Sequence, residues 1–202
     1  MSTLGPLGVT VCLFCALVVA CAPSPATHGS LRDPIVPSPL DVDQTSDGVT
    51  WNPYHAIVRA KVLAAFRGLT NHDVRPALSV MADNVTYTFD GDHALGGTRV
   101  SRAGVERWFG RLLRLLPGPF AIRSVEVTGW PWSTRAVTTF EHQVTPPGGE
   151  AYWAPGTQVV ELRWGVAVRI RTRVTDMAGL ERTLDAMARA GEREAVAPQI
   201  LE

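Results

Sequence analysis

Cysteine is absent from most of this chain, because its only three cysteines are Cys12, Cys15 and Cys21. The sequence after position 21 therefore has no disulfide, no thiol nucleophile and no cysteine-ligated zinc site. The short motifs of serine hydrolases, dinucleotide-binding enzymes, P-loop proteins and zinc proteases are also missing. These absences argue against several large enzyme classes.

An excess of charge is absent as well, since 19 basic residues balance 19 acidic ones. No broad field of one sign favours nucleic acid, so we expect no nucleic-acid partner. Asp90 and Asp92 begin like a calcium loop, but Ala94 and Ser101 stand where further ligands are needed. We therefore predict no metal site and no cofactor.

The N-terminal segment carries a continuous apolar run over 9–20 and no lysine or arginine before Arg32. The run is too short to span a bilayer, but it is long enough for the core of a signal peptide. It ends in Val18-Val-Ala-Cys21, which resembles a bacterial lipobox. We expect 1–21 to be a signal and lipobox segment with lipid attached to Cys21, which would hold the domain at the membrane outside the cytoplasm. The alternative is a start codon assigned too far upstream of a cytoplasmic protein.

Residues 22–52 are rich in proline and polar residues, and they predict a disordered linker. Helical spacing of apolar residues then begins, so we place the folded domain at 53–190 and a C-terminal tail at 191–202. We expect helices over about 54–68, 72–81, from Ser101 to Leu116, and 177–190. Ser101 and Asp176 are suited to cap the last two helices at their N-termini.

Strands are predicted by alternation and by turn residues. Val85, Tyr87 and Phe89 alternate with polar residues, which is typical of a half-buried strand. Four further strands are expected near 120–130, 134–145, 151–164 and 166–176, and Trp164-Gly165 is suited to a tight hairpin.

The order helix, helix, strand, helix and four long antiparallel strands resembles the nuclear transport factor 2-like superfamily. The loop Gly91-Asp-His-Ala-Leu-Gly-Gly-Thr98, the ending Arg173-Val-Thr-Asp176 and the segment Tyr152-Trp-Ala-Pro-Gly156 are similar to its SnoaL-like branch. The resemblance covers about 54–197. It implies an α+β fold, with a cone-shaped, curved antiparallel sheet packed on about three helices around a pocket, plus a C-terminal helix. The superfamily includes polyketide cyclases, isomerases and dehydratases as well as members without any catalytic activity, so the fold does not decide the function.

Three residues are candidates for acid–base chemistry: Asp90, His93 and His142. Similarity to ketosteroid isomerase would put a catalytic aspartate at Phe89, whereas Asp90 is one residue further and belongs to the opposite strand face. For Asp90 and His93 we favour the alternative that they belong to a solvated polar loop, and His142 is also explained as a core or rim histidine. Arg169, Arg171 and Arg173 share one strand face, where they either clamp an anion or pair with Glu161 and Glu126.

A ligand pocket, if present, is expected to be lined by aromatic residues, namely Tyr87, Phe89, Trp108, Phe140 and Trp153. We favour the binding of a small hydrophobic molecule. The first alternative is a cofactor-independent cyclase, isomerase or dehydratase that uses the Asp/His candidates. The second is an interaction module, such as a homodimer, that has no active pocket.

Overall fold

The computed structural model describes residues 52–202. The predicted signal segment, Cys21 and all of the predicted linker except Asn52 lie outside the described residues. No helix within 52–202 combines the length and the apolar character that crossing a bilayer requires.

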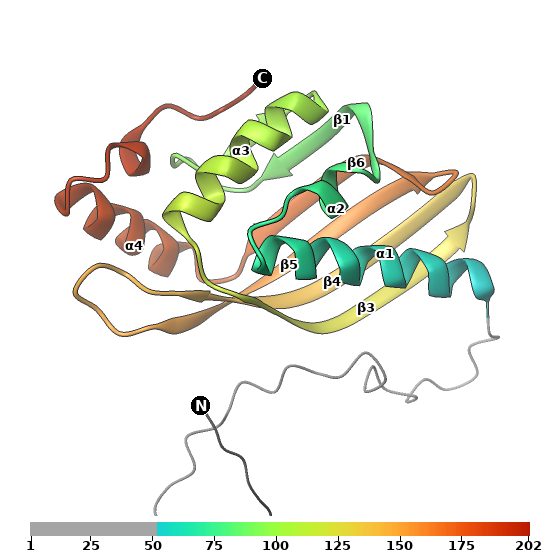
Figure 1. Ribbon diagram of the computed structural model, residues 1–202, viewed down its shortest axis with the longest axis horizontal. Coiled ribbons are helices and arrows are strands. Elements are labelled where there is room, and N and C mark those ends of the chain that lie inside the picture. The colour runs from blue at the N-terminus through green and yellow to red at the C-terminus, as the bar shows by residue number, and fades with distance from the viewer. Residues whose placement is uncertain (1–51) are drawn as a thin grey trace, which may run out of the picture. The chain divides into compact units, whose positions relative to one another are not determined.

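One six-stranded sheet forms the framework of the domain (Figure 1). Its strands follow the order β2-β1-β6-β5-β4-β3, and every neighbouring pair is antiparallel except β1 and β6, which are parallel. The strands are β1 (Met81–Phe89), β2 (Gly97–Arg99), β3 (Phe120–Trp130), β4 (Ser133–Val144), β5 (Tyr152–Arg163) and β6 (Val166–Val174). The four long strands at the C-terminal end therefore form the predicted antiparallel meander.

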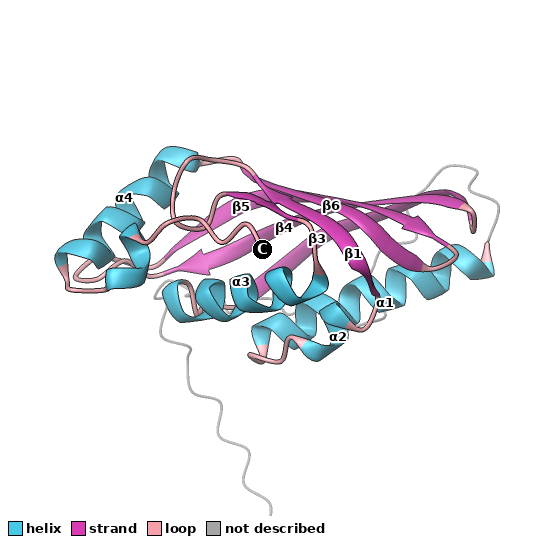
Figure 2. Cartoon of the chain, turned by 90° about the horizontal axis from the view of Figure 1, so that it is seen from above, coloured by secondary structure: helices cyan, strands magenta, loops and turns pink. Residues whose placement is uncertain are grey.

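Helices cover one face of this sheet, as Figure 2 shows for α1, α2 and α3. They are α1 (Pro53–Thr70), α2 (Arg75–Leu78), α3 (Arg102–Leu115), α4 (Met177–Arg189) and the short 3₁₀ helix η1 (Arg193–Val196). Helix α4 lies beyond the end of the sheet near the β4–β5 hairpin (Figure 1). The predicted α+β fold, with three helices on a curved sheet and a C-terminal helix, is confirmed.

Local sequence explains where α3 and α4 begin and which side they bury. The Ser101 hydroxyl accepts a hydrogen bond from the Gly104 amide at 3.0 Å, and the Asp176 carboxylate accepts one from the Gly179 amide at 2.8 Å. The apolar stripe of α3 is buried along its length, from Val105 through Trp108 to Leu115. Both N-caps and the stripe agree with the prediction from sequence.

The second helix and the polar loop differ from the prediction. Helix α2 spans only Arg75–Leu78, because Met81 already begins strand β1 and pairs with Ala167 of β6. Helix α1 continues through Gly68, where an added Cβ would lie 2.6 Å from the Asp73 carbonyl oxygen. This glycine permits close packing in the helix rather than ending it. The expected loop after β1 contains the three-residue strand β2, which pairs with β1.

The C-terminal residues pack on the domain through a buried arginine. Arg99 is fully buried, and its guanidinium donates to the carbonyl oxygens of Leu95, Gly97 and Ile200 at 3.1, 2.8 and 2.7 Å. The guanidinium also lies 5.0 Å from the centroid of the Trp108 ring. Burial lowers the pKa of Arg99 to about 10, so it remains charged at neutral pH. The tail thus has a specific attachment that its sequence did not reveal.

Candidate functional site

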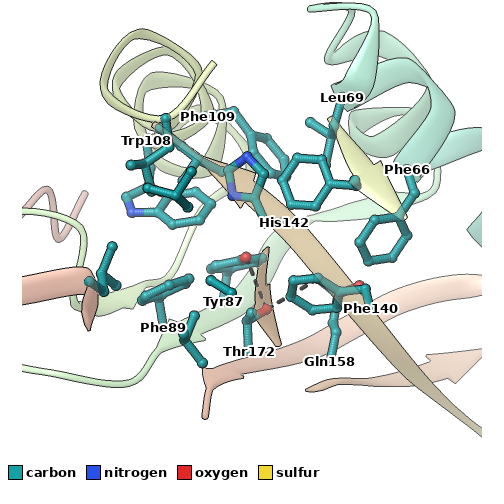
Figure 3. A pocket seen from close by; sticks show the side chains of 17 residues that line it. Phe66, Leu69, Tyr87, Phe89, Trp108, Phe109, Phe140, His142, Gln158 and Thr172 are labelled. Atoms are coloured by element: carbon teal, nitrogen blue, oxygen red, sulfur yellow. Dashed lines mark hydrogen bonds between the residues drawn. The ribbon is translucent and has the colours of Figure 1, made fainter. Parts of the chain in front are cut away.

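A pocket lies between the helix-covered face of the sheet and helices α1, α3 and α4 (Figure 3). Its volume is about 530 Å³, including open solvent at its mouth. The rings that form its walls stand close together, with the centroids of Tyr87 and Phe89 at 4.8 and 5.5 Å from that of Trp108. Seven aromatic side chains form much of the wall: Phe66, Tyr87, Phe89, Trp108, Phe109, Phe120 and Phe140.

Besides His142, three polar side chains on the strands belong to this wall, and they contact one another. The hydroxyl oxygens of Tyr87 on β1 and Thr172 on β6 lie 3.1 Å apart, and the Gln158 amide on β5 donates to Thr172 Oγ1 at 3.1 Å (Figure 3). Burial raises the pKa of Tyr87 to about 12, although the hydrogen bond with Thr172 acts in the opposite direction. Tyr87 is therefore a neutral phenol at physiological pH.

The hydroxyl pair can offer one donor to a ligand. With the Gln158 amide in this orientation, the Thr172 oxygen accepts from Gln158. The single bond between Tyr87 and Thr172 uses only one of the two hydroxyl protons, whichever group donates. The other proton is not used by this bond, so a carbonyl or hydroxyl oxygen of a ligand could accept it. Sequence alternation placed Tyr87 in the pocket but gave no sign of its partners on β5 and β6.

His142 lines the same pocket but is already held by the backbone. Its Nε2 lies 2.9 Å from the Gly118 carbonyl oxygen, and because a carbonyl only accepts, Nε2 is the donor. Its ring stacks on Phe120 with the centroids 4.0 Å apart. Burial lowers the pKa of His142 to about 4, while hydrogen bonding to the carbonyls of Gly118 and Leu116 acts in the opposite direction. A neutral His142 thus holds the connection between α3 and β3 in place. Because of its lowered pKa, it is a weak proton acceptor at pH 7.

Asp90 lies on the other face of the sheet from the pocket. Its carboxylate accepts hydrogen bonds from Arg171 Nε at 3.0 Å and from Arg173 Nε at 2.8 Å. Burial alone would raise the pKa of Asp90, but the bonds and charges of Arg173 and Arg171 outweigh it and lower the pKa. Phe89, one residue earlier, lines the pocket. The one-residue offset seen in the sequence therefore separates Asp90 from the pocket, and Asp90 neutralises two arginines instead.

The third arginine of this row, Arg169, pairs with Glu161 on the neighbouring strand at 3.3 Å. Paired side chains thus account for all three arginines of β6, but only Glu161 is a partner that the sequence predicted, because Asp90 pairs with the other two. Glu126, the other predicted partner, takes no part in these pairs. The row does not form an anion clamp that faces the pocket.

His93 belongs to the loop between β1 and β2, and it does not line the pocket. Its ring packs edge-on against Phe89, with the centroids 5.8 Å apart, and its Nδ1 accepts from the Leu95 amide at 3.3 Å. Its Nε2 is buried without a hydrogen-bond partner. Burial is the main cause that lowers the pKa of His93, so the neutral ring is favoured. The three acid–base candidates therefore do not converge on one site.

Four of the five predicted pocket aromatics do converge: Tyr87, Phe89, Trp108 and Phe140. Trp153 does not line the pocket, because its neighbour Ala154 faces inward and successive strand residues point to opposite faces. Trp153 therefore lies apart from the other four. Phe66 of α1 also lines the pocket but was not among the predicted residues, although its place in an apolar helical stripe was the available signal.

A second cavity of about 560 Å³ adjoins the first on the side of α1 and α2. Phe66, Leu69, Phe109 and Gln158 border both cavities. The second one is almost entirely apolar, apart from Gln158 and Lys61 at its edge. Within 52–202, no three histidine, aspartate or glutamate side chains are grouped as a metal site would require.

The family comparison agrees with this architecture. The family model of the SnoaL-like domain matches residues 62–170, and no curated protein sequence matches the chain. Among solved structures, TerC co-crystallised with polyporic acid is 23% identical with a TM-score of 0.52, covering 63% of this chain and 98% of TerC.

Two further solved structures show the same fold. A protein from Jannaschia, proposed to be a SnoaL-like polyketide cyclase, is 14% identical with a TM-score of 0.54, covering 67% of this chain and 97% of its own. An NTF2-like protein of unknown function from Burkholderia pseudomallei is 20% identical with a TM-score of 0.51, covering 62% and 95%. At these identities the structural matches establish the fold alone, whereas the family model spans more than half of the sequence. The chain therefore belongs to the SnoaL-like domain family, and its fold is the one seen in NTF2-like proteins.

Proposed function

We propose that the domain binds a small, flat and largely apolar molecule that carries a carbonyl or hydroxyl oxygen. The observation that supports this most directly is the Tyr87–Thr172 hydroxyl pair, which keeps one proton unused by its own bond in a largely apolar pocket. Apolar walls with a few placed polar groups are the usual composition of small-molecule sites. The narrow interior favours a planar ligand, for which the aromatic side chains would move apart slightly. TerC, which shares the fold, was crystallised with polyporic acid.

Binding without turnover fits the geometry better than acid–base catalysis by the predicted residues. Asp90 is ion-paired on the far face, His93 does not line the pocket, and the Nε2 proton of His142 is bound to the Gly118 carbonyl. A general acid or base must reach the reacting atom of the substrate. Only His142 of the three lines the pocket, and its lowered pKa makes it a poor proton carrier at neutral pH.

Native mass spectrometry of the protein purified from its own host tests the proposal directly. We expect a bound organic molecule whose mass is lost on denaturation. Val174 lines the pocket and is only half-buried, so Val174→Trp should fill the space with little strain. The matched control is Val196→Trp, because Val196 is 70% exposed and lines neither cavity.

The fluorescent probe anilinonaphthalene sulfonate provides a second test that needs no knowledge of the ligand. Its emission should rise with the parent and with Val196→Trp, and should rise much less with Val174→Trp, while circular dichroism confirms that each variant is folded. Equal emission from all three proteins, together with no copurified molecule, would refute the binding proposal. For a carbonyl ligand found in this way, Thr172→Val should weaken binding about three- to tenfold, the usual value of one hydrogen bond.

We also propose that Cys21 carries the lipid that tethers the domain outside the cytoplasm. The support is the apolar run before Val18-Val-Ala-Cys21. Cells are labelled with a fatty-acid probe and fractionated, and Cys21→Ser is expected to lose both the label and the membrane association. The same labelling in parent and variant would rule out this anchor.

A further inference from the structure

Three exposed tryptophans form one cluster at the end of the sheet near the start of α1. Trp130, Trp132 and Trp164 are 62%, 56% and 73% exposed. Trp130 and Trp132 stack with their centroids 5.7 Å apart and their planes within 5°, and Trp164 lies 6.3 Å from Trp132. The first two come from the β3–β4 turn and the third from the β5–β6 turn. We call this group the tryptophan tip.

The backbone conformation at Trp164 is unfavourable for tryptophan, which indicates that the stability of the fold does not require this side chain. Trp164 has φ 53° and is followed by Gly165 with φ 78°, so both residues of the hairpin turn are in the left-handed region. Asn-Gly is the usual pair for such a turn, and a bulky residue in the left-handed region is strained. A side chain that is 73% exposed offsets little of this strain by burial.

Among the described residues, the three segments that form and adjoin the tryptophan tip carry apolar and basic side chains but no acidic ones. The start of α1 is held beside it, because Tyr54 Oη lies 2.8 Å from Thr134 Oγ1 and His55 Nε2 lies 2.7 Å from the Gly129 carbonyl oxygen. The segments 52–60, 128–134 and 162–166 contain no aspartate or glutamate, but they do contain Arg59 and Arg163. Ile57 and Val166 add exposed apolar surface, at 56% and 41% exposure.

We propose that the tryptophan tip inserts into the headgroup region of an anionic lipid bilayer. Tryptophan is enriched at membrane interfaces, because its ring is apolar while its N–H keeps a polar partner. Arginines beside it are attracted to anionic lipids, and nearby carboxylates, which would be repelled, are absent from these segments. The described chain also begins at this end, at Asn52 (Figure 1).

The tip and the ligand pocket lie at opposite ends of the long strands. The tip contains the turn that follows Trp130 and the turn before Val166, whereas the pocket is lined by His142, Ala154 and Val174 at the other ends of β4, β5 and β6. A bilayer bound at the tip therefore leaves the pocket accessible. The membrane contact and ligand binding can be tested independently.

The test uses the full chain with Cys21→Ser, so that no lipid anchor contributes, and vesicles of phosphatidylglycerol and phosphatidylcholine. Vesicle-bound protein is measured by sedimentation, and contact is measured by quenching of tryptophan emission with brominated phosphatidylcholine. We expect Trp130→Ser/Trp132→Ser/Trp164→Ser to bind several-fold less and to show less quenching. Trp153→Ser is the matched control that leaves the tip intact, and it should bind like the parent.

Trp164→Asn is the control for the possibility that a variant binds fewer vesicles only because it has unfolded. Asparagine suits the left-handed turn, so this variant should melt at the same temperature as the parent or higher and yet bind vesicles more weakly. Equal vesicle binding by the parent and the triple variant would overturn the proposal. A second result would also overturn it: sedimentation velocity shows a dimer of the parent that is lost in the triple variant, while vesicle binding stays the same. The tip would then be an interface between two copies of the chain. In every variant, the emission of anilinonaphthalene sulfonate reports separately on the pocket.

Discussion

Strand β6 presents two different chemistries on its two faces. Arg169, Arg171 and Arg173 point to the outer face, where carboxylates neutralise them. Ile170, Thr172 and Val174 alternate with them and face the helices, and Thr172 belongs to the polar group of the pocket. The three arginines of β6 are therefore on the face without the pocket, and β6 contributes only the uncharged Thr172 to the polar group that it forms with Tyr87 and Gln158.

The two faces also differ in what holds them together. The inner face depends on close-packed rings and on buried polar groups that must find partners, whereas the outer face depends on ion pairs open to solvent. Buried groups of the first kind contribute several kilocalories per mole, and exposed ion pairs contribute about one or less. Substitutions on the two faces should therefore differ in size and in their dependence on pH and salt.

Phe140→Ala should have the largest effect. The Phe140 ring packs against Phe66 and Phe120 with centroids at 5.3 and 5.8 Å, and it lies against Gly156, where an added Cβ would come within 2.6 Å of the ring. Its removal should lower the free energy of unfolding by about 3–5 kcal/mol, measured by urea denaturation. Glu141→Ala, one residue along the same strand but on the outer face, is the control. Similar losses in the two variants would contradict the distinction between the faces.

His142 should make the stability depend on pH. Its pKa is about 4 in the folded protein, below the ordinary value of 6.5, so the unfolded chain binds more protons between these two values. The contribution is fully present above pH 6.5 and is lost as the pH falls toward 4, by about 3 kcal/mol. Thermal melting of the parent and of His142→Gln checks this, because the variant should lack most of this slope. Parallel pH profiles of the two proteins would show that His142 is not responsible.

Asp90→Asn should cost about 1 kcal/mol, because Arg171 and Arg173 are largely exposed and solvent screens the two pairs. The lowered pKa of Asp90 means that its contribution is constant above its ordinary pKa of 3.8 and is lost only as the pH falls below that value. Emission of anilinonaphthalene sulfonate should not change in this variant. A large fall in probe binding would mean that Asp90 acts on the pocket after all.

The smallest effect is expected at the pair of Arg123 and Glu141, which joins β3 to β4 on the outer face. Glu141→Gln should change the free energy of unfolding by no more than about 0.5 kcal/mol. High salt should shrink even this difference, because it screens exposed charges. Denaturation at low and high ionic strength measures both quantities, and a salt-independent loss would indicate a role in packing instead.

Periodicity and capping predicted the elements that make their own local contacts. These are the apolar stripe of α3, the caps Ser101 and Asp176, and the alternation of Tyr87 and Phe89 with polar residues. Each is a pattern within one element, so a single sequence is enough to find it. The short strand β2 and the shortened α2 could not be found in this way. Their limits are set by pairing with β1 and β6, which is a tertiary contact.

Strand alternation predicted which face of a strand each candidate residue occupies, but it did not predict the contacts between strands. Alternation gave the inward direction of Phe89 and Phe140 and the outward direction of Asp90. It could not pair Tyr87 with Thr172, because those residues lie on strands that are adjacent in the sheet but 85 positions apart in the chain. Similarly, no local pattern shows that the Gly118 carbonyl occupies His142 or that Trp153 faces away from the pocket.

The parallel pairing of β1 with β6 has a consequence for how the domain folds. The meander β3–β4–β5–β6 is built from strands that follow one another, whereas β1 finds its partner β6 only after the chain has crossed to the far edge of the sheet at β3 and come back through the meander. Such long loop closures slow folding, since their entropy cost precedes the contacts that repay it. Tyr87 meets Thr172 only when this closure is complete. A ligand that needs the hydroxyl pair would therefore bind only to chains that have finished folding. The rate at which binding appears during refolding would then report the rate at which β1 pairs with β6.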